Sequence, residues 1–174
     1  MVSFVRLSPS DAPLLATVGG ASLLESHGHS APAAVMQQYV EDHFSEEACE
    51  AELKEKANCF TAIYFNGRPA GYSKIIFNTP CPAVSLQPVT KLERLYLLKG
   101  FYDQKLGHSL LQHAIALSKE AGEKGLWLDV WTENHRATRF YQKQGFATVG
   151  EGRFTLTGNY TNPVWIMLLR YPGI

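Results

Sequence analysis

The segment Gln104-Lys105-Leu106-Gly107-His108-Ser109 has the composition of an anion-binding turn. It lies between a predicted strand, residues 92–98, and a predicted helix, residues 106–121. The first backbone N–H groups of such a helix have no partner within the helix, and the helix dipole favours negative charge there. Gly107 permits close backbone approach and Lys105 adds a positive charge, so a pyrophosphate is a suitable ligand. A purely structural turn can have the same composition, so this segment alone leaves both interpretations open.

Two common phosphate-binding motifs, G-x-x-x-x-G-K-[ST] and G-x-G-x-x-G, do not occur in the sequence. The turn instead resembles the Q/R-x-x-G-x-G/A pyrophosphate loop of GNAT acetyltransferases, with Ser109 where the family usually has Gly or Ala. A later segment, Asn134-His135-Arg136-Ala137-Thr138-Arg139-Phe140-Tyr141-Gln142-Lys143-Gln144-Gly145-Phe146, resembles the family's pattern N-x-x-A-x-x-F-Y-x-x-x-G-F. The order, spacing and predicted elements of the two segments also match, and the earlier hairpin with Gly71-Tyr72 fits as well, so the resemblance spans nearly the whole chain.

The resemblance implies an α/β protein with the single-domain GNAT fold over residues 1–174. Its central sheet would be mixed, mostly antiparallel, of about six to seven strands with helices on both faces. It also implies an N-acetyltransferase that uses acetyl-CoA as co-substrate and transfers the acetyl group directly to an amine.

This reaction defines the side chains that the enzyme needs. An alkylamine has a pKa of about 10.4, so only about one molecule in a thousand is neutral at pH 7, and a base or desolvation must supply the rest. By resemblance, Glu93 lies where several family members place a carboxylate that removes this proton; an ion pair with Arg94 or Lys91 is the alternative role. Tyr141 matches the tyrosine that protonates the departing thiolate, with core packing as its alternative. Asn134 can cap a helix, bind the co-substrate, or do both.

The remaining co-substrate contacts also follow from the resemblance. The backbone of Leu95, Tyr96 and Leu97 is expected to pair with the acetyl carbonyl and the pantetheine amides, as an added strand would. The predicted pyrophosphate-binding residues are Gln104, Lys105, Leu106, Gly107, His108 and Ser109. The six histidines form no recognisable ligand set, so no metal is expected.

The elements that must position these groups are predicted from hydrophobic periodicity and turn residues. A short first helix follows Ser10-Asp11, and Gly19-Gly20 is expected to weaken or end it. Asn66-Gly67 is typical of a type I′ hairpin turn. The other predicted elements are a helix around residues 35–40, a helix 45–53 capped by Ser45, strands 58–65 and 68–77, a loop 78–89, a strand 126–131, a helix from Asn134 to Gly145, and strands 146–149, 153–156 and 164–169. This order describes a mixed α/β sheet with helices on its faces.

Composition excludes several classes of protein. The longest apolar stretches run to about half a dozen residues, against the roughly 20 that a membrane-spanning helix requires, and no signal peptide is recognisable. The three cysteines lack metal-site spacing, which favours free thiols, and a cytoplasmic location is expected. The basic residues are scattered, so no nucleic-acid partner is expected. Exposed strands near the C-terminus would allow a homodimer.

The net charge is zero, but it is unevenly distributed. Residues 1–60 contain nine acids and three bases, and residues 61–174 contain seven acids and thirteen bases, so the two parts carry about −6 and +6. This asymmetry is consistent with a cationic ligand near the first part and an anionic ligand on the second, or with solvated helix faces.

Within the superfamily, residues 39–45 and 92–97 look most like those of polyamine N-acetyltransferases, and a polyamine such as spermidine is the hypothesised acceptor. The acids behind this hypothesis are Glu41, Asp42, Glu46, Glu47 and Glu50. Two alternatives remain open at this stage: acetylation of a peptide N-terminus or lysine, and a non-catalytic acyl-CoA-binding regulator.

Overall fold

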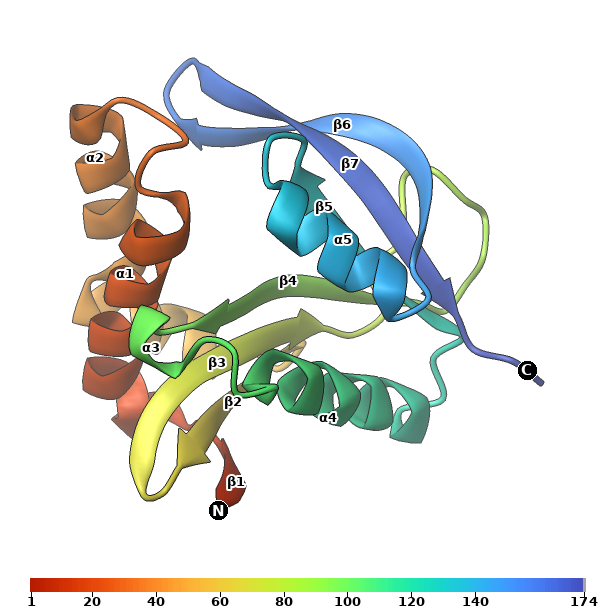
Figure 1. The fold of residues 1–174 in the computed structure, drawn as a ribbon, viewed down its shortest axis with the longest axis horizontal. Coiled ribbons are helices and arrows are strands. Elements are labelled where there is room, and N and C mark those ends of the chain that lie inside the picture. The colour runs from red at the N-terminus through yellow and green to blue at the C-terminus, as the bar shows by residue number, and fades with distance from the viewer. Residues whose placement is uncertain (174) are drawn as a thin grey trace.

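The computed structural model describes residues 1–173, which form one seven-stranded sheet flanked by helices (Figure 1). The strand order is β1-β2-β3-β4-β5-β7-β6. Of the strand pairs in this range, β4–β5 is parallel and the others are antiparallel. The strands are β1 (Val2–Arg6), β2 (Asn58–Phe65), β3 (Arg68–Ile76), β4 (Thr90–Leu97), β5 (Gly125–Trp131), β6 (Ala147–Thr157) and β7 (Tyr160–Arg170). The helices are α1 (Ala12–His27), α2 (Ala33–Phe44), α3 (Glu46–Lys54), α4 (Leu106–Glu120) and α5 (His135–Lys143), with 3₁₀ turns at Pro9–Asp11 and Lys99–Phe101. The predicted fold class is confirmed.

Several predicted local features also hold. Asn66 and Gly67 both have positive φ, 49° and 77°, as a type I′ turn between β2 and β3 requires. The Ser45 hydroxyl accepts the Ala48 N–H at 3.1 Å and caps α3. The Asn134 side chain accepts the Ala137 N–H at 3.2 Å and caps α5. These features depend on neighbours in the sequence, which is why the sequence predicts them.

The prediction that Gly19-Gly20 would weaken or end the first helix is wrong, because α1 continues without a break to His27. A Cβ atom at Gly19 would lie 2.5 Å from the Phe44 ring, and one at Gly20 would lie 3.5 Å from Val40. The two glycines therefore let α2 pack closely on α1. The free energy gained by burying that contact outweighs the loss of helix stability that each glycine causes, about 1 kcal/mol per glycine.

The C-terminal strands also differ from the prediction. Residues 146–149 and 153–156 were predicted as separate strands, but residues 147–157 form the single strand β6, which pairs with β7 through two register shifts. Strand β1 was not predicted, and its five residues are all exposed with no alternation of burial. Its pairing with β2 defines it.

The helices lie in two groups on the sheet (Figure 1). Helices α1, α2 and α3 pack on one face, around Phe60, Tyr72 and Leu15. Helices α4 and α5 contribute to a second core around Leu111, Leu128 and Tyr141. Among the helices of residues 1–173, none is long and apolar enough to cross a membrane.

Candidate active site

Strand β4 contains a β-bulge at Glu93. Lys74 of β3 pairs with Arg94, and the next residue, Ile75, pairs with Leu92, so Glu93 is the extra residue on β4. On a regular strand, adjacent side chains point to opposite faces. At this bulge, Glu93 and Arg94 instead line the same pocket. The bulge therefore brings two consecutive charged side chains to one face of the sheet.

Strands β4 and β5 diverge directly before the bulge. Their pairing consists of Thr90 with Leu126 and Lys91 with Trp127. Beyond this point a cleft of about 440 Å³ is lined by residues 92–97 on one side and 128–131 on the other. Ligand sites commonly have volumes of about 300–1,000 Å³. Within the described chain this side of residues 92–97 has no partner strand, so an extended ligand with amide groups can pair with it.

Leu95, Tyr96 and Leu97 all line this cleft, where their backbone can meet such a ligand. Tyr96 also packs edge-on against Tyr72, with 5.9 Å between ring centroids. Their role in binding the co-substrate stays a prediction.

The N-terminus of α4 closes one end of the cleft. Asp103 and Lys105 have positive φ, 63° and 59°, and turn the chain sharply into the helix. Gly107 lines the cleft, and a Cβ atom there would come no closer than 3.7 Å to any side chain. Packing within the chain therefore does not require glycine at this position. Close approach of a ligand to the first helical turn does give a reason for it, so this end fits an anionic group.

The other predicted loop residues surround Gly107 but do not line the cleft. The side chain of Leu106 is buried in the core, whereas those of Gln104, Lys105 and His108 are exposed. Ser109 donates from its hydroxyl to the Lys105 carbonyl at 3.3 Å, within the first turn. Pyrophosphate binding by these residues thus remains a prediction that concerns mainly backbone N–H groups.

Arg136, which the sequence reasoning missed, lines the same cleft from α5. Its guanidinium lies 4.3 Å from the centre of the Tyr102 ring and donates to Asp103 at 3.5 Å. It therefore places a positive charge beside the turn that precedes α4. The sequence signal that could have indicated Arg136 was its position two residues after Asn134 in the second motif.

Asn134 and Tyr141 both line the cleft from the start and the body of α5. Tyr141 is buried and packs edge-on against Phe140 and Phe146, with centroid distances of 5.2 and 5.4 Å. Burial raises the pKa of Tyr141 well above its ordinary value, so the phenol is protonated at neutral pH and can donate a hydrogen bond. Its core packing and its place in the cleft are thus compatible.

A second, smaller cavity of about 90 Å³ adjoins the cleft, and we call it the inner pocket. Its lining comes from α1, α2, β4, β5 and the β6–β7 hairpin: Leu23, His27, Ser30, Tyr39, Lys91, Leu92, Glu93, Arg94, Tyr96, Asp129, Trp131, Phe154, Leu156, Asn162 and Val164. Glu93, Asp129 and His27 line the cleft as well, so the two cavities meet at these side chains.

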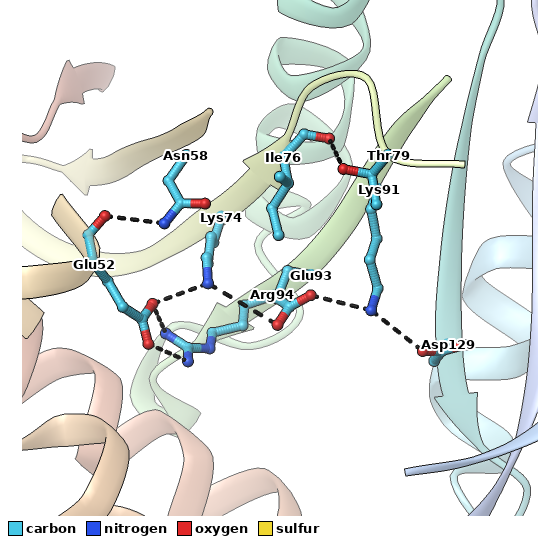
Figure 2. Close-up of polar contacts among 9 residues, drawn as sticks. All are labelled: Glu52, Asn58, Lys74, Ile76, Thr79, Lys91, Glu93, Arg94 and Asp129. Carbon is cyan, nitrogen blue, oxygen red and sulfur yellow. Dashed lines mark hydrogen bonds and ion pairs between the residues drawn. The ribbon is translucent and has the colours of Figure 1, made fainter. Parts of the chain in front are cut away.

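A chain of alternating charges crosses the sheet beside this junction (Figure 2). Its six members are Glu52, Arg94, Lys74, Glu93, Lys91 and Asp129. Arg94 donates to both oxygens of Glu52, at 3.1 and 3.2 Å, and the Lys74 Nζ lies 2.9 Å from Glu52 and 3.9 Å from Glu93. The Lys91 Nζ lies 3.1 Å from Glu93 and 3.5 Å from Asp129. Glu93 thus does form an ion pair with Lys91, and it also lies near Lys74.

The pKa values of the two carboxylates at the junction are shifted in opposite directions. Burial acts to raise the pKa of Glu93, but Lys91, Lys74 and Arg94 outweigh it and lower that pKa below its usual value. Burial also raises the pKa of Asp129, and there the opposing effect of Lys91 alone does not reverse it. Asp129 therefore holds a proton more readily than an ordinary aspartate, and both carboxylates are candidate proton acceptors. It was missed from the sequence, although an acid inside an otherwise apolar strand was a sign of it.

His27 is the third titratable group at the junction, and the sequence analysis considered it only as one of six histidines without a recognisable ligand set. Burial and then the charge of His29 lower the pKa of His27 to about 4, so the ring is neutral at pH 7. The Ser26 hydroxyl can donate to the Ser22 carbonyl at 2.8 Å and accept from the His27 Nδ1 at 2.7 Å. This arrangement leaves Nε2 as a hydrogen-bond acceptor. In residues 1–173, no group of three His, Cys, Asp or Glu side chains is arranged to hold a metal ion.

Comparison with known proteins identifies the family of this chain. A family model described as the acetyltransferase (GNAT) family matches residues 22–146. The chain belongs to this family. It is an N-acetyltransferase, and its co-substrate is acetyl-CoA.

Individual proteins agree with this assignment. The protein described as "Uncharacterized N-acetyltransferase in pepI 3'region" from Lactobacillus delbrueckii subsp. lactis is 26% identical over 155 residues, which cover 89% of this chain and 90% of that protein. The crystal structure of the PaiA N-acetyltransferase from Thermoplasma acidophilum, in complex with coenzyme A, superposes with a TM-score of 0.77 at 20% identity. The superposition covers 98% of this chain and 99% of the Thermoplasma acidophilum chain, and it shows that the two folds agree.

Proposed function

We propose that this N-acetyltransferase acetylates a primary amine whose nitrogen enters the inner pocket, where Glu93 and Asp129 receive its proton. The observation that carries this proposal is the junction itself. Two carboxylates lie where the small inner pocket opens into the cleft between β4 and β5. An amine in the inner pocket therefore approaches the same point as a thioester held in the cleft.

Each part of the site has a task in this reaction. When bound, acetyl-CoA supplies an activated acetyl group as a thioester. The backbone of Leu95, Tyr96 and Leu97 is proposed to hold its pantetheine arm, and the first turn of α4 its pyrophosphate. No covalent nucleophile on the protein is needed, because the amine attacks directly.

The protons are proposed to move in opposite directions on the two sides of the reacting carbonyl. Asp129, whose pKa is raised, or Glu93 accepts one proton of the bound ammonium before the amine attacks, directly or through water. The Tyr141 phenol, protonated at neutral pH, donates its proton to the departing thiolate, and the second proton that the nitrogen loses as the amide forms restores the phenol.

The experiment is an assay of thiol release with a panel containing propylamine, spermidine, a lysine peptide and a peptide with a free N-terminus. We expect turnover with at least one free amine, and a fall in kcat/KM of about 100-fold in both Glu93→Gln and Asp129→Asn. Glu120→Gln is the matched control, since Glu120 is exposed on α4 and lines neither cavity. Wild-type turnover that neither substitution at the junction reduces would refute the proposed roles.

The polyamine hypothesis is tested in the same panel. Its five acids, Glu41, Asp42, Glu46, Glu47 and Glu50, are exposed and line neither cavity, so the site gives them no direct contact with an acceptor. Charge reversal at these positions that leaves the KM for spermidine unchanged would count against a polyamine. A peptide acceptor has support of a different kind: a structure with a TM-score of 0.68 and 20% identity is the ribosomal-protein-S18-alanine N-acetyltransferase from Escherichia coli.

We further propose that residues 1–174 form one domain, which the single seven-stranded sheet supports. A homodimer is also proposed, because the C-terminal strand β6 is an edge of that sheet. Sedimentation equilibrium measures the oligomeric state directly, and a monomer at micromolar concentration would contradict the dimer.

A further inference from the structure

Lys91 places a primary ammonium between the two carboxylates of the junction (Figure 2). It is the last residue of β4 that pairs with β5, so its side chain bridges the strands where they begin to diverge. The Nζ atom lies 3.1 Å from Glu93, 3.5 Å from Asp129 and 5.0 Å from the centre of the Trp127 ring. The side chain is 20% exposed and lines the inner pocket. The space between the two carboxylates is thus already occupied by a cation.

The charges around the inner pocket cancel. The network holds three carboxylates, Glu52, Glu93 and Asp129, and three cations, Lys74, Lys91 and Arg94. Arg94 and Lys74 both contact Glu52 at short distances and together leave one positive charge in excess there, whereas Lys91 is the cation that contacts both carboxylates of the junction. An acceptor that carries one ammonium meets no net negative field, and a second ammonium nearby meets the like charge of Lys91.

We propose that Lys91 determines acceptor selectivity. Its ammonium lies between Glu93 and Asp129 and offsets one of their two charges, so the inner pocket favours an amine with no second positive charge near the reacting nitrogen. This inference rests on the proposed function, because it takes the inner pocket as the acceptor site.

The same arrangement lets the charge of Lys91 affect the protonation of Glu93 and Asp129. Lys91 acts to lower the pKa of both Glu93 and Asp129. The other charged or titratable groups around Glu93 and Asp129 are Lys74 on β3, Arg94 and Tyr96 on β4, Glu52 on α3, Tyr39 on α2 and His27 on α1. None of these lies within ion-pair distance of both carboxylates, whereas Lys91 does.

The substitution that tests this is Lys91→Met, which keeps a flexible chain of similar length and removes the charge. Lys91→Arg retains the charge. Lys54→Met is the matched control, since it removes a lysine charge from exposed α3, outside both cavities. The ratio of KM values for propylamine and 1,3-diaminopropane is measured for each protein. We expect Lys91→Met to shift that ratio about tenfold towards the diamine, because one nearby repulsive charge is lost. We expect Lys54→Met to behave like the wild type, and Lys91→Arg to keep the wild-type preference between the two amines because it retains the charge.

A second measurement does not depend on turnover. Carbon-13 NMR titration of the carboxyl groups of Glu93 and Asp129 is expected to show both pKa values rising in Lys91→Met, because a nearby opposite charge that favours the ionised carboxylate is lost. Carboxyl pKa values that stay unchanged overturn the inference whatever the activity, and so does an unchanged KM ratio in an active variant. A wild type that acetylates none of the amines instead refutes the proposed function, and the NMR titration still decides whether Lys91 balances the junction.

Discussion

Substitution of Gly107 by aspartate tests where the pyrophosphate of acetyl-CoA binds. The new carboxylate would lie in the first turn of α4, at the end of the cleft, where the ligand's phosphates are proposed to meet free N–H groups. Two like unit charges about 5 Å apart repel by about 1–3 kcal/mol for effective dielectric constants of about 80 down to 20. The pyrophosphate carries two such charges. We therefore expect the Kd for acetyl-CoA to rise by at least about 25-fold, since about 2 kcal/mol is lost at the lower limit.

Isothermal titration calorimetry measures this directly, and two variants separate charge from shape. Gly107→Ala adds only a methyl group, which would come no closer than 3.7 Å to any side chain, so this variant isolates the effect of close ligand approach. Ala121→Asp adds the same charge at the exposed far end of α4, about 21 Å away at 1.5 Å per residue and well beyond the Debye length. We expect Gly107→Ala to bind more weakly than the wild type but more tightly than Gly107→Asp, and Ala121→Asp to bind normally. A folded Gly107→Asp protein that binds acetyl-CoA within about threefold of the wild type would refute this placement.

Three further substitutions test stability and catalysis. Glu52→Gln leaves the buried Arg94 and Lys74 without their shared carboxylate, so we expect urea denaturation to show a loss of about 3 kcal/mol. Burial acts to raise the pKa of Glu52, but the two cations outweigh it and lower that pKa. The stability advantage of the wild type should therefore be complete above the unfolded pKa of about 4.3 and disappear as the pH falls through the lower folded value. A stability advantage that persists at low pH would contradict this. Gly71→Ala would put a Cβ 2.2 Å from a β4 carbonyl oxygen, so we expect a fall in thermal stability equivalent to about 1–3 kcal/mol, and unchanged melting would contradict the close packing of β3 on β4. Tyr141→Phe should lower kcat about 100-fold and leave acetyl-CoA affinity nearly unchanged, and a kcat equal to that of the wild type would remove the phenol from the reaction.

Much of the fold could be predicted because its signals are local. The Asn66-Gly67 turn, the Ser45 and Asn134 caps and the periodic pattern of α4 depend on interactions within a few residues, and each is present in the structure. The continuation of α1 through Gly19-Gly20 was not predictable in this way, because it depends on Phe44, a residue distant in the sequence.

The sequence by itself determined the family, the co-substrate and the segments that carry both motifs, because those depend on residue types at fixed spacing. Only the tertiary structure decided the composition of the candidate site. The bulge turns Glu93 towards the inner pocket, the divergence of β4 and β5 opens the cleft, and Lys91 joins Glu93 to Asp129 across that divergence. The proton affinities of these groups follow from burial and from charges on other elements. Such effects act between residues that folding brings together, so spacing along the chain does not encode them in a readable form.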